Sequence, residues 1–241
     1  MRTDTVKKIT ALVAAGLILL PSVLAAAVGC SLSDPDRDIK RMFPQSTGYK
    51  TSFVTLKEKA VEREGEPGVA KTLEAIEAKL GDKLDPVYES ADVPYAFYTV
   101  LEGTEVIGLV HGVNQKGTYG GMQLILATDL TGKIVDFYYQ KISSPEASRF
   151  RDKAFTQQFR GLTLFDFLLH DGQVKKEGAA DRIAVIKDPS AKNHQDFLNT
   201  LRGIKKNLIL LELLAPAGAG KTGSQGKTED ETEDQKEDSG K

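Results

Sequence analysis

The stretch GVNQKGTYGGMQLILATDLTGKIVDFYYQKISSP, residues 112–145, decides the fold. Two apolar runs, Met122–Thr128 and Ile134–Lys141, flank the segment Asp129-Leu130-Thr131-Gly132-Lys133. The glycine in that segment supplies the positive φ that a short connection between two strands requires. Apolar side chains alternate along the first run and occupy both faces of the second. The pattern predicts a β-hairpin in a half-buried antiparallel sheet.

A glycine-rich segment precedes this hairpin. Gly117, Gly120 and Gly121 lack side chains, and Tyr119 lies between them. A loop of this kind lets backbone N–H groups approach a ligand closely. The alternative is a tight turn without a ligand, and spacing alone favours it.

Length and composition indicate one domain of ordinary size with extensions. The chain has 241 residues, of which 40% are hydrophobic, and a formal net charge of −2. This charge does not favour non-specific nucleic-acid binding, which needs a concentrated positive surface, so we expect no nucleic-acid partner. Cys30 is the single cysteine and there are three histidines, which excludes an intrachain disulfide framework and disfavours a metal centre rich in thiolates or imidazoles.

The N-terminus has the organisation of an export signal. Basic residues precede the apolar run Ile9–Leu20, and small residues then lead to Cys30. This resembles a bacterial lipoprotein signal, in which residues 1–29 are removed and Cys30 is lipidated. The alternative is an uncleaved anchor, because about twenty apolar residues can span a bilayer. We expect a membrane-anchored lipoprotein of the cell envelope that faces the periplasm or the cell exterior.

The rest of the chain predicts a tether over residues 30–35 and a single α+β domain over residues 36–214. A twisted antiparallel sheet packed by amphipathic helices is expected. Besides the hairpin, the predicted strands are Thr51–Leu56, Tyr95–Leu101, Val106–Gly112 and Asp181–Ile186. The predicted helices are Asp36–Phe43, Gly68–Leu80, Ala147–Phe159 and Asn193–Leu214. Charge predicts a solvated face or loop over Lys57–Glu66, and Leu162–Leu169 is a compact apolar segment.

The tail, residues 215–241, contains no large apolar side chain and ends in a run rich in Glu, Asp and Lys. Such a segment cannot bury enough surface to offset the entropy of ordering it, so we expect disorder. A charged interaction tail is the alternative. Ala215–Thr222 has the look of a phosphate-binding loop, but a predicted helix precedes it where that loop requires a strand.

Tyr119-Gly120-Gly121, the hairpin and the region around Arg160-Gly161 resemble the FMN-binding domains of respiratory electron-transport complexes. Examples of that family are the periplasmic FMN-binding domains of the sodium-translocating NADH:quinone reductase and of the Rnf complex. The likeness covers about Asp38–Leu214 and depends on the order of the elements. It implies a flavoprotein that transfers electrons through FMN to or from a redox protein partner.

The chain departs from this family just before the last helix. Family members carry an Asp, then Ser-Gly-Ala-Thr, and then a further threonine that can hold FMN through a phosphoester bond. Here Asp188-Pro189-Ser190-Ala191-Lys192-Asn193-His194-Gln195-Asp196 occupies that region, and Asp196 replaces the acceptor threonine. We therefore expect no covalent FMN. After the hairpin, Ser143-Ser144-Pro145-Glu146 replaces the family's Glu-Thr-Pro-Gly segment.

The resemblance nevertheless implies a set of non-covalent FMN contacts. These are Gly117, Tyr119, Gly120, Gly121, Ser143, Ser144, Lys192 and Asn193. The glycines would offer backbone amides, the tyrosine would stack on the ring, and the serines would bind the ring or the ribitol. Lys192 and Asn193 would bind the phosphate at a helix N-terminus, although the alternative is that they form only a polar capping region.

No catalytic residue or metal ligand is assigned. His111 is expected to be a satisfied sheet residue, and His170 lies in a predicted turn. No Ser–His–Asp or Cys–His arrangement indicates a hydrolase, so enzymatic activity is left open. The alternative function is a flavin-free binding or scaffold lipoprotein that has lost its cofactor site.

Overall fold

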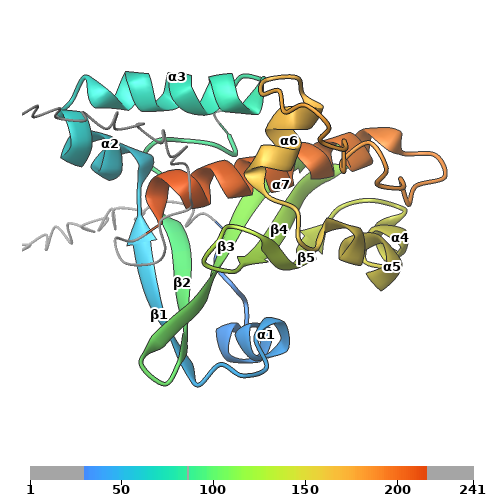
Figure 1. Cartoon of the computed structure of the whole chain (residues 1–241), viewed down its shortest axis with the longest axis horizontal. Helices are drawn as coiled ribbons and strands as arrows, with labels where there is room; N and C mark the ends of the chain where they lie inside the picture. The colour runs from blue at the N-terminus through green and yellow to red at the C-terminus, as the bar shows by residue number, and fades with distance from the viewer. Residues whose placement is uncertain (1–29, 86, 216–241) are drawn as a thin grey trace, which may run out of the picture.

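The structure, a computed structural model, describes residues 30–85 and 87–215. It contains a five-stranded antiparallel sheet in which neighbours along the chain are neighbours in space, with helices on both of its faces (Figure 1). The strands are β1 (Gly48–Val54), β2 (Tyr95–Glu102), β3 (Glu105–Gly117), β4 (Gly120–Thr128) and β5 (Ile134–Ile142). The predicted α+β class is confirmed.

The central hairpin forms as its sequence predicts. Asp129 accepts hydrogen bonds through Oδ1 from the backbone N–H groups of Thr131 and Lys133, at 2.8 and 3.0 Å. Gly132 has φ 78°, a left-handed conformation that favours glycine. Along β4, alternate side chains enter two different cores, so both faces of this strand are buried.

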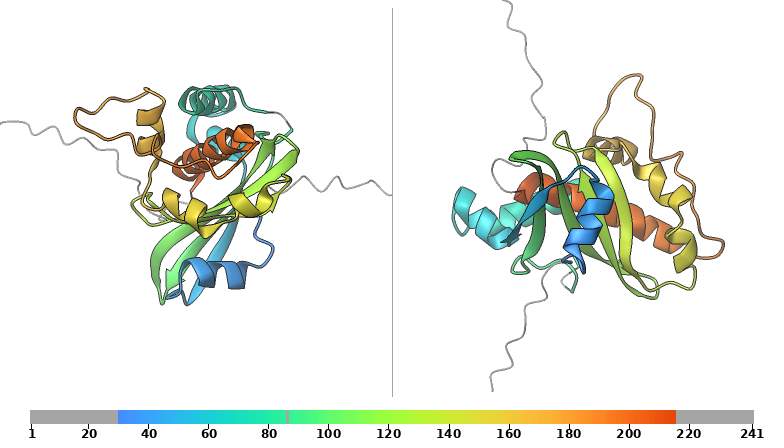
Figure 2. Two further views of the ribbon diagram at one scale, coloured as in Figure 1. Left: turned by 90° about the vertical axis from the view of Figure 1, so that its right-hand side faces the viewer. Right: turned by 90° about the horizontal axis from the view of Figure 1, so that it is seen from below.

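Eight helical segments surround the sheet in the described part of the chain. They are α1 (Pro35–Met42), α2 (Leu56–Glu64), α3 (Gly68–Leu80), α4 (Ala147–Phe150), α5 (Lys153–Thr156), the 3₁₀ helix η1 (Gln157–Phe159), α6 (Leu164–His170) and α7 (His194–Leu214). Helix α7 is the longest and crosses β3 and β4 on one face of the sheet, whereas α1 covers the other face (Figure 2). Gly203 permits the close approach of α7, because a Cβ there would lie 2.9 Å from Leu124 Cδ1.

Two hydrophobic cores result, one on each face of the sheet. The inner core joins α7 and the phenylalanines of the β5–α6 region to β4 and β5. The outer core joins α1 and the segment before it to β2, β3 and β4. Gly108 and Gly112, both on β3, leave room for Phe43 and Cys30 respectively, so these glycines serve packing on the outer face.

The region Lys57–Glu66, for which the sequence predicts a solvated face or a loop, is not a loop: it forms α2, whose charged residues Lys57, Glu58, Glu62, Arg63 and Glu64 are exposed. Thr55 and Glu58 form a reciprocal capping box, with Thr55 Oγ1 2.9 Å from the N–H of Glu58. Leu56 and Ala60 are buried and fix the helix against the domain. The preceding strand accordingly runs over Gly48–Val54.

The predicted helix Ala147–Phe159 is divided into α4, α5 and η1. Asp152 interrupts it, because its side chain accepts a hydrogen bond from Ala154 N at 2.8 Å and starts a new helix. The predicted strand Asp181–Ile186 is a turn, in which the Asp181 carboxylate accepts from the N–H groups of Ile183 and Ala184. Its residues Ile183 and Ile186 are buried without strand pairing.

The segment expected to be a tether, residues 30–35, packs onto the outer face of the sheet. Leu32 N donates to Tyr98 Oη at 3.0 Å, and Ser33 N donates to Gln140 Oε1 at 2.8 Å. The predicted signal peptide lies outside the described residues, as does the tail apart from Ala215. No helix among the described residues is long and apolar enough to cross a membrane.

Candidate functional site

The predicted glycine loop is a tight turn between two long strands. β3 continues to Gly117 and β4 begins at Gly120, so only Thr118 and Tyr119 lie between the paired glycines. Of the two interpretations of this segment, a loop that approaches a ligand and a tight turn, the structure has the tight turn that spacing favours. Gly120 has φ 132°, and a Cβ there would lie 3.2 Å from Ser143 Cβ, so this glycine admits Ser143 beside the turn.

The turn is bound to the start of α7 through polar side chains. Thr118 N donates to Asp196 Oδ1 at 2.7 Å, and Thr118 Oγ1 donates to Asn193 Oδ1 at 3.2 Å. Asn193 Nδ2 donates in turn to Ser144 Oγ at 3.4 Å and also to Asp196. The structure thus brings together Gly117, Gly120, Ser143, Ser144 and Asn193, which come from three separate parts of the chain.

The backbone amides that precede α7 donate hydrogen bonds to a carboxylate. Glu146 accepts hydrogen bonds from Ala191 N at 2.9 Å and Lys192 N at 3.1 Å. These hydrogen bonds lower the pKa of Glu146 below its usual range, so the carboxylate is charged at neutral pH. The family resemblance implies an FMN phosphate at this position.

These residues do not fit an FMN phosphate. Glu146 takes the amides of residues 191 and 192, and Asp196, which is fully buried, takes the N–H of Thr118. A phosphate at either place would meet a like charge within a few ångströms and would have to displace a satisfied acceptor. Tyr119 is 59% exposed at the tip of the turn and Lys192 is also exposed, so neither contributes to an enclosed site.

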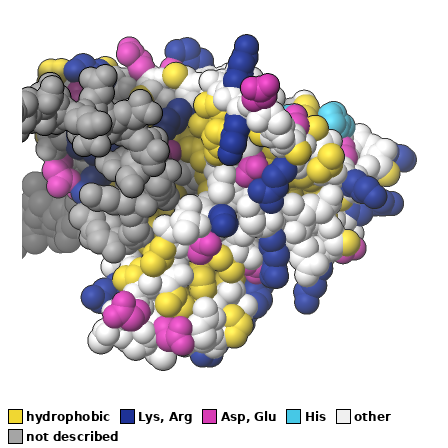
Figure 3. Space-filling model, viewed as in Figure 1, with side chains coloured by type: hydrophobic (Ala, Val, Ile, Leu, Met, Phe, Trp, Pro, Cys, Tyr) yellow, Lys and Arg dark blue, Asp and Glu magenta, His cyan; other side chains and the backbone are white. Residues whose placement is uncertain are grey.

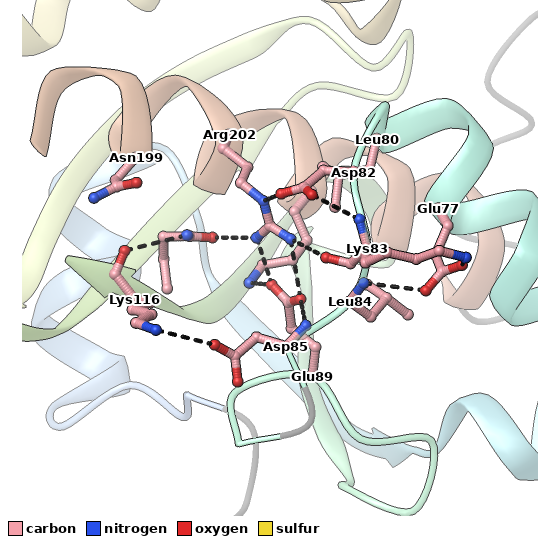
Figure 4. A network of polar contacts seen from close by, with 12 residues as sticks. Glu77, Leu80, Asp82, Lys83, Leu84, Asp85, Glu89, Lys116, Asn199 and Arg202 are labelled. Atoms are coloured by element: carbon pink, nitrogen blue, oxygen red, sulfur yellow. Dashed lines mark hydrogen bonds and ion pairs between the residues drawn. The ribbon is translucent and has the colours of Figure 1, made fainter. Parts of the chain in front are cut away.

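A cleft of about 560 Å³ lies beside the turn. Its lining comes from the segment after α3, the end of β3 and the first half of α7. Arg202, one of the lining residues, lies in the middle of the polar network in Figure 4. The lining residues are Asp82, Lys83, Asp85, Gln115, Lys116, Gly117, Thr118, Gln195, Asn199 and Arg202. Gly117 is the one predicted FMN contact among them. The lining contains no aromatic or large aliphatic residue, whereas a flavin ring requires an apolar or aromatic surface.

A buried ion-pair network behind this cleft was not predicted. Glu89 accepts from Arg202 Nη1 at 2.7 Å and also pairs with Lys206, and both Glu89 and Lys206 side chains are 2% exposed. Lys206 Nζ donates further to Asn114 O at 2.7 Å. Burial lowers the pKa of Lys206 to about 8, although the Glu89 charge opposes this shift. The sequence feature that could have indicated this network is Lys205-Lys206-Asn207, three polar residues within the apolar pattern of the last helix.

His111 lies in β3, as expected, but it is only partly satisfied, because its buried Nε2 has no hydrogen-bond partner among the described residues. Its Nδ1 is 2.9 Å from Asn207 Oδ1, and its ring stacks on Phe97 with centroids 4.3 Å apart. Asn207 Nδ2 donates to the carbonyl oxygens of His111 and Leu124, which ties α7 to the sheet. Burial lowers the pKa of His111 to about 4, so the imidazole is neutral at physiological pH.

Cys30, the predicted lipidation site, is 1% exposed in the outer core. Its carbonyl oxygen and Sγ lie over Gly112, and the Nε2 of Gln140 is 4.0 Å from Sγ. Burial raises the pKa of the thiol to about 12. A lipid attached to Sγ would have to leave this packed position, so lipidation requires the segment around Cys30 to detach from the sheet.

The sequence matches no protein-family model and no curated protein. Among the described residues, no group of three or more His, Cys, Asp or Glu side chains could hold a metal ion. The assignment of function therefore depends on the geometry of the site itself.

Proposed function

We propose that the protein is an exported, lipid-anchored binding or scaffold domain of the cell envelope that holds no FMN at the predicted site. One observation carries this proposal: the carboxylates of Glu146 and Asp196 occupy the backbone donors at which a phosphate would bind. The side-chain amide of Asn193, which the resemblance assigns to the phosphate, donates to Ser144 and Asp196 within the fold.

Both charge and burial oppose a phosphate at this place. Asp196 is 0% exposed and accepts hydrogen bonds from Thr118 and Asn193, so its carboxylate is an integral part of the packing. A dianionic phosphate beside this buried carboxylate would be repelled in a region of low effective dielectric constant. Expelling Glu146 would in addition break its hydrogen bonds with the N–H groups of Ala191 and Lys192, which would then need a new acceptor.

Electron transfer through non-covalently bound FMN is the second candidate function. The convergence of Gly120, Ser143, Ser144 and Asn193 favours it, because the family resemblance assigns these residues to one site. This candidate requires Glu146 to leave the amides before α7. Only this second candidate function implies a redox protein partner.

Titration with FMN separates the two candidates. For the exported wild-type protein we expect neither quenching of FMN fluorescence nor a thermal shift at high micromolar ligand. Saturable quenching that weakens in Lys192→Ala, but not in Lys141→Ala, which changes an exposed lysine of β5, would support electron transfer instead. Circular dichroism of each variant serves as the control for folding.

A further inference from the structure

The two edges of the sheet differ in their cover. At β5, Ile134 N donates to Leu162 O at 2.8 Å and Gly161 N donates to Ile134 O at 2.7 Å, so the start of that edge is paired. At the opposite edge, β1 pairs with β2 alone among the described residues (Figure 1). An unpaired edge presents a row of free backbone donors and acceptors.

β1 has few of the features that usually protect such an edge. It is seven residues long, it pairs with β2 in unbroken register, and it contains no proline. Lys50 is its one charged residue, and Phe53 is 57% exposed. Apolar side chains also gather over the lower part of the sheet in Figure 3, where β1, β2 and β3 extend beyond α7. Strands of this kind pair with other strands.

We propose that β1 pairs antiparallel with β1 of a second copy, about a twofold axis at Thr51. Two five-stranded sheets would then join into one continuous sheet. Twofold dimers are the commonest form of self-association, and their interface requires a surface that complements itself. The sequence of β1 meets this requirement.

In this register each residue of β1 faces a suitable residue of the second copy. Tyr49 faces Phe53, Thr51 faces Thr51, and Lys50 faces Ser52. Residues 49, 51 and 53 share one face because strand side chains alternate. No like charges meet, so the repulsion that would oppose self-pairing is absent from this strand pair.

The aromatic face of β1 favours the same arrangement. Tyr49 already packs edge-on against Tyr98 of β2, with ring centroids 5.8 Å apart. Phe53 of the second copy would extend this row across the new strand pair and lose its exposure to water. Cross-strand aromatic pairs are among the stabilising contacts of antiparallel sheets.

The opposite face of β1 provides an independent observation. Ser52 Oγ is buried and has no hydrogen-bond partner among the described residues. The proposed register places Lys50 of the second copy directly opposite, and a rotation of the Ser52 side chain toward the edge would let this oxygen accept from its ammonium group. A buried hydroxyl without a partner is costly, so pairing would relieve that cost.

Disulfide trapping of the full chain in membranes tests the register. In Thr51→Cys the two introduced cysteines would meet on the axis, where paired Cα atoms lie roughly 4.5–5.5 Å apart, within disulfide range. Mild oxidation should convert most of this variant to a covalent dimer. Lys141→Cys, exposed on the opposite edge strand, is the matched control and should stay monomeric. Both variants retain Cys30, so any cross-linking through it appears in both.

Light scattering on the detergent-solubilised chain tests the association without oxidation. We expect the wild type to show twice the monomer mass and Phe53→Lys to show the monomer mass. Phe165→Lys changes another exposed phenylalanine, 41% exposed on α6, and should remain dimeric.

Three outcomes overturn the proposal. The first is a wild type that is monomeric at every concentration. The second is a dimer in which Thr51→Cys cross-links no better than Lys141→Cys, since another surface would then associate. The third is that Thr51→Cys forms the disulfide dimer only after residues 216–241 are deleted. This result would mean that the tail of the same chain, and not a second copy, pairs with β1 in the full chain.

Discussion

The carboxylate of Asp196 accepts a hydrogen bond from the backbone N–H of Thr118 at 2.7 Å and thereby ties the first turn of α7 to the β3–β4 turn. In the FMN-binding domains that the sequence resembles, a threonine that can carry the flavin is expected at this position. At the position that the resemblance aligns with this threonine, the structure has a carboxylate that makes a structural contact. This relationship determines the predictions for the site.

Replacing Asp196 should destabilise the domain. Asp196→Ala removes a fully buried carboxylate and leaves Thr118 N and the buried side-chain amide of Asn193 without this acceptor, and such a loss typically costs roughly 1–3 kcal/mol. Urea unfolding followed by circular dichroism measures this free energy. Gln195→Ala changes the exposed neighbouring residue and should alter the free energy of unfolding by less than about 0.5 kcal/mol. Equal stability of the two variants would contradict a structural role for Asp196.

Flavin that survives denaturation should be absent. We expect none when the chain is exported in a host that has the flavin-attaching enzyme, because Asp196 offers no hydroxyl. Thr200 is the nearest alternative acceptor, but it is fully buried and its Oγ1 is engaged with Tyr139 Oη and Asp196 O. In-gel flavin fluorescence after denaturation checks this. A fluorescent band that disappears in Thr200→Ala would show that attachment occurs after all.

Removing Glu89 should cost far more stability than removing an exposed carboxylate. Glu89→Ala leaves Lys206 buried without its charged partner, and losses of about 3–5 kcal/mol are typical of such sites. Glu62→Ala breaks the exposed pair with Lys59 and should cost no more than about 1 kcal/mol. Thermal and urea unfolding of both variants provide the comparison. Similar losses would mean that the Arg202–Glu89–Lys206 network does not hold the segment after α3 against α7.

Stability should fall in mild acid because of His111. Burial lowers the pKa of this group to about 4 in the folded state, against about 6.5 when unfolded. Between these values the unfolded chain binds a proton that the folded chain does not, so the free energy of unfolding decreases as pH falls from about 6.5 to about 4. The full effect is roughly 3 kcal/mol. His111→Gln should show a shallower slope than wild type over this range, and identical slopes would contradict the assignment.

Lipidation should free the N-terminal segment from the sheet. Cys30→Ala should abolish lipid labelling and release the protein from the membrane fraction. In this variant the amide of Leu32 should stay protected by Tyr98 Oη, whereas in the lipidated wild type it should exchange faster with solvent. Hydrogen exchange with mass spectrometry measures the difference. Full membrane retention of Cys30→Ala would favour an uncleaved anchor.

The sequence predicts the β4–β5 hairpin well because its signals are local. The alternation of Met122, Leu124 and Leu126 and the turn at Gly132 act over a few residues, and the structure has both. Helix α2 was missed because its charges hid a local signal, the capping box formed by Thr55 and Glu58. The break at Asp152 and the turn at Asp181 were missed because side-chain hydrogen bonds there outweigh the apolar periodicity.

The site was predicted in part. The grouping of Gly120, Ser143, Ser144 and Asn193 came from the family resemblance, and the structure brings these residues together. Glu146 was missed because its partners, the amides of residues 191 and 192, are 45 and 46 positions away along the chain. Such a contact depends on the folded backbone, and no local pattern reports it.

The most direct measurement of the central claim is FMN titration of the wild type beside a variant with both carboxylates neutralised, Glu146→Gln with Asp196→Asn. Asn at position 196 keeps an oxygen that can accept from Thr118 N, whereas Gln at position 146 keeps one of the two oxygens that accept from Ala191 N and Lys192 N. Circular dichroism of the variant checks that the fold persists while the two negative charges are removed. We expect no saturable fluorescence quenching for the wild type at high micromolar FMN, and measurable binding for the neutral variant. Saturable binding by the wild type, unchanged in the neutral variant, would contradict the claim that these two carboxylates close the site to FMN.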